Sequence, residues 1–91
     1  MRIPDNISRE HMLMVIERMD AGELLVPPVR RSTKYCLIHE GRHYAPKEVV
    51  RQANVVPNRK ELWGFGGGKK RTTPFCKSRG FRIDKHGRAP H

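Results

Sequence analysis

A run of glycines followed by a run of cations is the segment of the sequence best suited to hold a phosphate. Residues 66–68 are all glycine, so their backbone N–H groups can approach an anion closely, and residues 69–71 add positive charge. Trp63 and Phe65 come just before them, and an aromatic ring there either stacks on a nucleobase or anchors a core. For Phe65 we expect the core role, whereas for Trp63 both roles stay open.

This segment does not have the pattern of a nucleotide-hydrolysing phosphate loop. That motif needs a glycine six positions before its lysine and a Ser or Thr directly after it. Here Trp63 lies six positions before Lys69, and Lys70 follows. We therefore expect no nucleotide cofactor and no nucleotide hydrolysis.

Four residues carry atoms that zinc prefers, namely Cys36, His39, His43 and Cys76. Their spacing argues against a site, because no Cys-x-x-Cys pair is present to fix a tetrahedral geometry. Cys36 falls within an expected strand, and the two histidines lie on either side of an expected turn. We therefore predict that the chain holds no metal.

The sequence also gives little support to catalysis. A nuclease needs several carboxylates for a metal or a compact His–Asn–His arrangement, and neither is visible. Cys76, near an expected helix start and beside Lys77, would have a lowered pKa if it were reactive, but a small core residue is the simpler interpretation. We predict that the protein is not an enzyme.

The balance of charge points to a polyanionic partner. Nineteen Lys and Arg residues oppose nine Asp and Glu residues in a chain of 91, which gives a formal net charge of +10. Such an excess repels itself, and a nucleic acid relieves that repulsion. Binding to a membrane surface is less favoured, because the sequence shows no basic helix with an apolar face. A basic surface that only keeps the protein soluble is the plainer alternative. With neither a secretory signal nor a membrane span in view, we expect a cytoplasmic protein.

The first helix is expected to begin at Ser8, whose hydroxyl can cap the free N–H groups of a helix start. Apolar residues then recur at three- and four-residue spacing, which turns one stripe toward a core. Gly22 suits the end of this helix because glycine tolerates the left-handed conformation. The stripe consists of Met12, Val15, Ile16 and Met19.

A β-hairpin and a second helix are expected next. Residues 35–38 are rich in strand formers, residues 40–41 read as a tight turn, and residues 42–44 return. Pro46 suits the first turn of the second helix, and Pro57 is expected to mark its end.

The last part of the chain is expected to hold a loop, a short helix and a strand. The loop covers residues 58–71, and Thr73 before Pro74 has the pattern of an N-cap followed by a first-turn proline. Gly80 would close this helix, and residues 81–83 alternate like a strand.

Together these elements predict an α+β fold. A small antiparallel sheet, made of the hairpin and the C-terminal strand, would pack against about three helices. The chain is long enough for one domain, residues 1–91, which we expect to be folded from about residue 8 to residue 83, with a flexible basic tail at 84–91.

A phosphate-binding surface is predicted where the second helix meets the glycine-rich segment. Lys47 and Arg51 are four residues apart on that helix and would share one face. The predicted nucleic-acid contacts are Lys47, Arg51, Trp63, Gly66, Gly67, Gly68, Lys69, Lys70 and Arg71.

Three segments resemble the motifs of a known module. Residues 35–47, YCLIHEGRHYAPK, resemble a Y-x-[LV]-x-x-x-G-[KR]-x-Y-P-P-K pattern. Residues 65–68, FGGG, followed by a threonine at 72 or 73, resemble F-S-G-G-x-x-T, and residues 75–83, FCKSRGFRI, resemble F-L-x-x-L-G-F-x-[IV]. Together the segments are similar to the N-terminal head domain of McrA-like, modification-dependent HNH restriction endonucleases.

The chain departs from these patterns at Ala45, Gly66 and Arg79, which replace a proline, a serine and a leucine. In that family the nuclease and the reader of the modified base are separate domains. The resemblance therefore implies an accessory role in contacting DNA or docking a protein, with Lys47 and the glycines as the positions to carry over.

These observations favour a non-enzymatic nucleic-acid-binding module whose partner is duplex DNA, in a restriction or defence context. Two alternatives stay open. One is a protein-interaction adaptor for a nuclease or for a phage or defence assembly, and the other is an RNA-binding factor, for which an exposed Trp63 would be suited.

Overall fold

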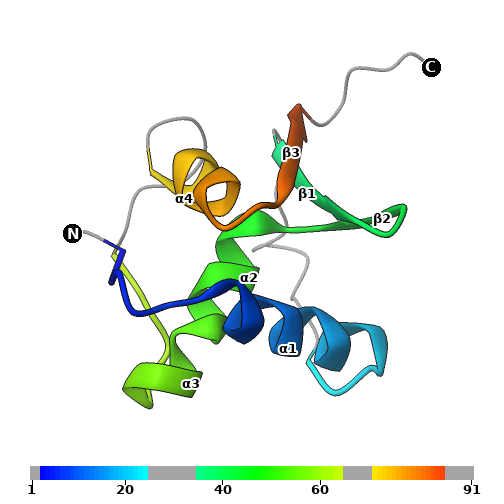
Figure 1. Cartoon of the computed structure of the whole chain (residues 1–91). Coiled ribbons are helices and arrows are strands. Elements are labelled where there is room, and N and C mark those ends of the chain that lie inside the picture. Colours follow the sequence, from blue (N-terminus) through cyan, green and yellow to red (C-terminus); the bar gives the residue numbers. More distant parts are fainter. Residues whose placement is uncertain (1–2, 25–34, 65–70, 86–91) are drawn as a thin grey trace.

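The computed structural model describes residues 3–24, 35–64 and 71–85. A three-stranded antiparallel sheet in the order β2-β1-β3 lies next to the helices (Figure 1). Helix α2 contacts β1, and α4 contacts β3. The predicted α+β fold is confirmed, because the hairpin and the C-terminal strand form one sheet. The elements are α1 (Arg9–Asp20), β1 (Tyr35–His39), β2 (Arg42–Tyr44), α2 (Pro46–Ala53), α3 (Val55–Asn58), α4 (Thr72–Ser78) and β3 (Arg82–Lys85).

Helix α1 begins where the sequence predicts. The backbone N–H of His11 donates to the Ser8 hydroxyl at 3.2 Å, and the Ser8 N–H donates to Nδ1 of His11 at 3.0 Å. This is a reciprocal capping box in which a histidine takes the usual place of Glu or Gln. The predicted stripe is also confirmed, because Met12, Val15 and Ile16 are buried in the core and Met19 packs against it.

The hairpin is confirmed in position and turn. Leu37 is the partner of Tyr44, and His39 is the partner of Arg42. Both turn residues have positive φ, 51° at Glu40 and 78° at Gly41, as a tight two-residue hairpin turn requires. Strand β3 then pairs with the other edge of β1, so that the buried Leu37 lies at the centre of the sheet.

Helix α2 occupies the middle of the molecule and packs against α1 and α4. Val49, Val50 and Ala53 are fully buried, and Pro46 stands in the first turn as predicted. The prediction that Pro57 ends this helix is wrong, because α2 ends at Ala53 and Pro57 lies inside α3. A proline is tolerated there because N–H groups in the first turn of a helix have no acceptor within the helix.

The predicted start of the last helix is also wrong. Helix α4 begins at Thr72, a buried residue, so Thr73 lies within its first turn and not at its N-cap, while Pro74 stands in the first turn as predicted. The Thr73 hydroxyl is buried and makes no hydrogen bond among the described residues. Gly80, with a φ of 84°, follows the helix as predicted.

The folded region is wider than predicted. Ile3 and Ile7 both belong to the hydrophobic core, so the fold begins before Ser8. Strand β3 runs from Arg82 to Lys85, which takes the sheet past the predicted limit at residue 83. The rest of the predicted tail, residues 86–91, lies outside the described residues.

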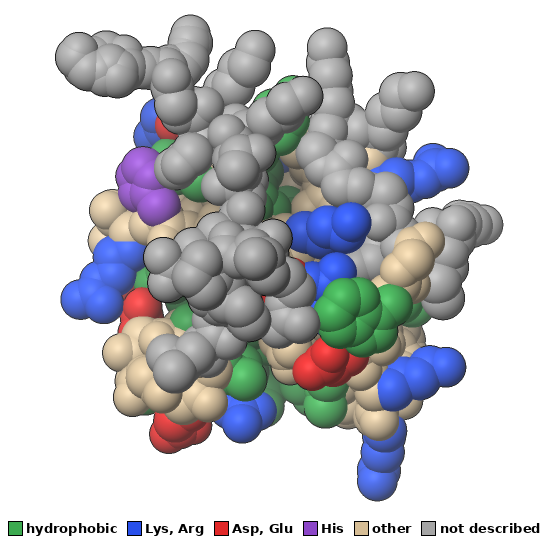
Figure 2. All heavy atoms as spheres, turned by 180° about the vertical axis from the view of Figure 1, so that it is seen from behind, with side chains coloured by type: hydrophobic (Ala, Val, Ile, Leu, Met, Phe, Trp, Pro, Cys, Tyr) green, Lys and Arg blue, Asp and Glu red, His purple; other side chains and the backbone are tan. Residues whose placement is uncertain are grey.

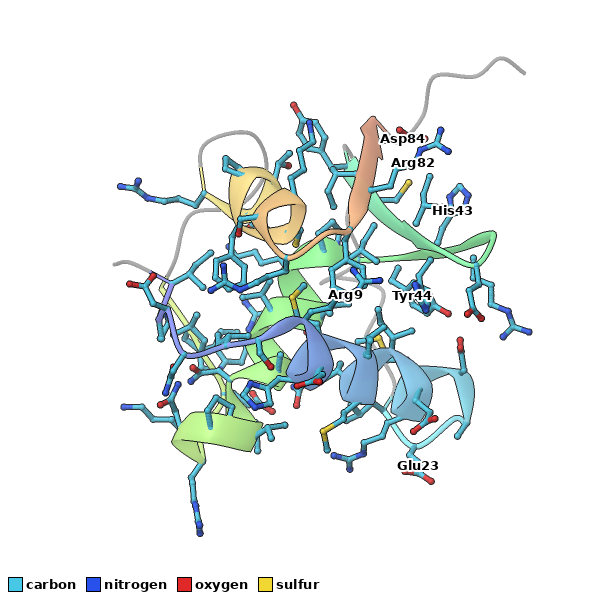
Figure 3. All side chains as sticks on the ribbon, in the orientation of Figure 1. Arg9, Glu23, His43, Tyr44, Arg82 and Asp84 are labelled. Atoms are coloured by element: carbon cyan, nitrogen blue, oxygen red, sulfur yellow. The ribbon has the colours of Figure 1, made fainter. Side chains whose placement is uncertain are left out.

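Two arginines join the N-terminal segment to the end of α4. Arg79 donates from Nε to the Ile7 carbonyl at 2.7 Å and from Nη2 to the Asp5 carbonyl at 3.0 Å, while its guanidinium lies 4.3 Å from the Phe75 ring centroid. Arg9, between α1 and the segment leading into β3 in Figure 3, lies 4.4 Å from the centre of the Phe81 ring. Arg79, which departs from the resembled motif, is therefore a structural residue.

Replacing Arg79 with alanine is expected to lower the free energy of unfolding by about 2 kcal/mol, because charged hydrogen bonds to two carbonyls and a ring contact are lost together. Urea unfolding monitored by circular dichroism measures the change. Lys77→Ala, an exposed residue on the same helix, should change stability by less than about 0.5 kcal/mol. Equal effects of the two variants would contradict this role for Arg79.

Two groups make the fold sensitive to alkali. Burial raises the pKa of the Cys76 thiol from 9.0 to about 12. Burial, and then the hydrogen bond that the Tyr44 hydroxyl donates to Asp20 at 2.6 Å, raise the pKa of Tyr44 from 10.0 to about 12. Both groups hold their protons more tightly in the folded chain than in the unfolded chain. Their contribution to stability is therefore full below about pH 9 and is lost as the pH rises toward 12.

The free energy of unfolding is therefore expected to fall steadily as the pH rises above about 9, and Cys76→Ala should flatten this fall even if it lowers stability at neutral pH. Urea midpoints measured between pH 7 and about pH 11 provide the test. Tyr44→Phe should flatten only the part above about pH 10. An unchanged slope in Cys76→Ala between pH 9 and 10 would show that this thiol does not titrate on unfolding.

Candidate nucleic-acid interface

The structure describes four of the residues predicted to contact nucleic acid. Lys47 is half-buried in the first turn of α2, Arg51 is buried in its last turn, Trp63 is 49% exposed, and Arg71 is exposed where α4 begins. The other predicted contacts, together with the core role predicted for Phe65, lie outside the described residues. Those contacts are Gly66, Gly67, Gly68, Lys69 and Lys70.

The expectation that Arg51 shares an exposed face with Lys47 is wrong. The Arg51 side chain is only 6% exposed and forms an ion pair with Glu48, one turn earlier on α2, whose side chain is 3% exposed. A buried guanidinium needs a full set of partners, and Arg51 finds them inside the protein. Arg51 therefore serves the structure, and we remove it from the predicted phosphate contacts.

Arg51 fastens the segment after α3 to α2. Its side-chain Nε donates to the carbonyl of Leu62 at 3.1 Å, and its own carbonyl accepts from the Leu62 N–H at 3.3 Å. The Leu62 side chain is at the same time part of the hydrophobic core. Three contacts of different kinds thus fix the backbone directly before Trp63.

The two residues before Leu62 are held in the same way. Asn54 donates from its side-chain amide to the carbonyl of Lys60 at 2.8 Å, and Gln52 donates to a carboxylate oxygen of Glu61 at 2.9 Å. The buried Asn54 also accepts from the side-chain amide of Asn58. Each of residues 60–62 is therefore hydrogen-bonded to one residue of the last turn of α2 or its C-cap.

The Trp63 ring rests on this framework. The Arg51 Cζ lies 3.9 Å from the ring centroid, within the range of a cation–π contact. The ring is thus neither a core anchor nor a free-standing side chain, because one part covers Arg51 while about half of its surface, 49%, faces solvent. Among the predicted residues, Arg51 and Trp63 are a pair that the structure brings together.

Sequence reasoning did not single out the residues that position Trp63, namely Glu48, Gln52 and Asn54. A signal was present, because Glu48 precedes Arg51 by three residues on a helix whose neighbours Val49 and Val50 are apolar. An opposite-charge pair within a buried stretch indicates a buried ion pair. The contact with Leu62 had no comparable local signal.

The four residues considered as zinc ligands do not come together in one place. Cys36 Sγ lies 3.4 Å from Nδ1 of His43, whereas His39 packs its ring edge against Phe81 and Cys76 is buried in the core. Burial, and then the charge of Asp84, raise the pKa of Cys36, which keeps the thiol protonated. Across the described residues, no three His, Cys, Asp or Glu side chains gather into a possible metal site.

The described cations lie at several places on the surface. On the face shown in Figure 2, the described Lys and Arg side chains are distributed over the view, with acidic and apolar side chains among them. Several cations are paired with acids, such as Arg42 with Asp20 at 3.4 Å and Arg82 with Asp84 at 2.8 Å. The described cations that are exposed and lie next to Trp63 or α4 in the sequence are Arg59, Lys60, Arg71 and Lys77.

No known protein family, curated protein or solved structure matches this chain. The similarity to the head domain of McrA-like endonucleases thus stays a prediction. Within the structure, residues 35–47 form the hairpin and the start of α2, and residues 75–83 form most of α4 and the start of β3. None of the described helices is both long and apolar enough to cross a bilayer.

Breaking the buried ion pair should disturb both the fold and the environment of Trp63. Glu48→Gln removes the charge opposite Arg51, and the free energy of unfolding should fall by about 3 kcal/mol. The tryptophan emission spectrum should change at the same time, because Trp63 is the chain's one tryptophan and rests on Arg51.

Glu17→Gln on α1 is the matched control, since it removes the same charge from an exposed position. It should leave both stability and emission nearly unchanged. A Glu48→Gln protein as stable as the parent would show that the ion pair is not what fixes this region.

Proposed function

We propose that this chain is a non-enzymatic nucleic-acid-binding module that contacts the phosphates of DNA. The observation that carries the proposal is Trp63, a half-exposed tryptophan held on a buried arginine in a chain of net charge +10. Aromatic rings beside cations are typical of nucleic-acid-binding surfaces.

Exposed cations on both sides of Trp63 in the sequence would meet the phosphates. Arg59 and Lys60 precede it, and Arg71 follows at the start of α4. We keep Lys47, Gly66, Gly67, Gly68, Lys69 and Lys70 in the proposal on the strength of the sequence.

Three carboxylates of the described residues serve the fold, which is in keeping with a binding role. Glu48 is engaged with Arg51, Asp20 accepts from Tyr44 and faces Arg42, and Asp84 faces Arg82. Carboxylates used in this way neutralise neighbouring cations and fix the fold. An accessory role in a restriction or defence context is a further part of the proposal, supported by the motif resemblance alone.

A protein-docking adaptor is the second candidate. Val55 and Val56 on α3 are 37% and 39% exposed, side by side on a short helix that could be covered by a partner. DNA would not displace a partner held by apolar contacts, so competition separates this function from the first.

The double variant Lys69→Ala with Lys70→Ala tests the phosphate contacts. We expect it to weaken binding to duplex DNA by a similar factor for every sequence, and to reduce the slope of log affinity against log salt by about 2. Fluorescence anisotropy with labelled duplexes at several salt concentrations measures both quantities.

Arg18→Ala with Arg42→Ala is the matched control, since it removes the same formal charge. Arg18, in the last turn of α1, faces Glu23, and Arg42, the first residue of β2, faces Asp20. Equal losses in the two double variants would mean that net charge alone drives binding, and no binding at low salt would remove DNA as a partner.

A further inference from the structure

The residues that hold Trp63 form a chain of contacts that starts in the core. Glu48 fixes Arg51, Arg51 fixes the carbonyl of Leu62, and the Arg51 guanidinium supports the Trp63 ring at 3.9 Å. The ordering of this ring is therefore achieved when the protein folds. A ligand that binds it would lose little affinity to side-chain ordering.

The exposed half of the ring is suited to a flat, electron-poor partner. An indole offers a broad apolar surface, and nucleobases stack on such surfaces with little regard for sequence because every base has a π face. The exposed cations Arg59 and Lys60, which come shortly before Trp63 in the sequence, favour a ligand that also carries phosphates.

From this arrangement we infer that Trp63 stacks on an unpaired nucleobase, so that the ligands of this site are single-stranded segments of nucleic acid. The inference rests on the proposed function and deepens it. In an uninterrupted duplex each base face is covered by the next base pair, and exposing one costs a few kcal/mol per step. A single strand, a gap or a flap offers base faces without that cost.

The response of Trp63 to ligands separates a stacking role from a purely structural one. If Trp63 only shielded Arg51 from water, its ring would be needed for stability and would be indifferent to ligands. If it stacks on a base, its emission must respond to bases and not to phosphates alone.

The chain's one tryptophan makes a direct test possible, because selective tryptophan excitation reports on Trp63 alone. Three probes of equal phosphate number are titrated at low salt: an oligothymidylate, a blunt-ended duplex of two strands and a strand of abasic residues. We expect saturable quenching with oligothymidylate and little change with the duplex or the abasic strand. Oligothymidylate should also bind about ten-fold or more tightly than the abasic strand.

A pair of variants then assigns the effect. Trp63→Leu should reduce the affinity for oligothymidylate about ten-fold and remove its advantage over the abasic strand, while the salt slope is kept. Met14→Ala on α1, a residue equally exposed at 49%, should retain the quenching and the preference. Circular dichroism of both variants checks that they are folded.

The outcomes separate the inference from the proposed function. Equal quenching by the abasic strand, or a Trp63→Leu protein that keeps its preference for oligothymidylate, would overturn the stacking site. Salt-dependent binding of all three probes without quenching would overturn stacking alone and leave phosphate binding in place. Absence of binding to every probe would overturn both.

Discussion

The buried ion pair between Glu48 and Arg51 connects the core of this protein with its surface. Both side chains are almost fully enclosed, in the helix that packs against α1 on one side and α4 on the other. Such a pair adds little net stability when compared with apolar residues of the same size, because removing two charges from water is costly. The pair instead fixes the positions of its neighbours, since a guanidinium can contact a carboxylate, a carbonyl and an aromatic ring at once. Arg51 does all three, and the position of Trp63 follows from it.

Two other arginines combine several contacts in the same way, and this changes how the net charge should be understood. Arg9, Arg51 and Arg79 each lie over an aromatic ring, and each donates hydrogen bonds to backbone carbonyls. These arginines hold together a chain with a thin core, because their stems cover apolar surface while their heads satisfy polar groups. At least three of the nineteen Lys and Arg residues therefore serve the fold and are not offered to a ligand.

Local signals allowed the fold class and several elements to be predicted from the sequence. The Ser8 cap, the apolar stripe of α1, the Glu40-Gly41 turn and the proline that opens α2 each act within a few residues, and each was correct. Pro57 was misinterpreted because a proline in a first turn and a proline that ends a helix look alike in sequence. The candidate site was harder, since the burial of Arg51 depends on Leu62, whose approach is a tertiary contact. Periodicity placed Arg51 on a helix, but it could not show what would cover that side of the helix.

The connection between the two ends of the chain bears on how the protein is made. Arg79 binds the carbonyls of Ile7 and Asp5, 72 and 74 residues earlier, and β3 pairs with β1 across most of the intervening sequence. During synthesis the N-terminal helix and the hairpin must wait, with Ile3, Ile7 and one edge of β1 uncovered, until residue 85 has left the ribosome. Contacts this distant in sequence are slow to form, and the waiting chain exposes both apolar surface and a strand edge. A nascent chain that stops short of β3 should therefore need a chaperone, because β3 is the strand that completes the sheet.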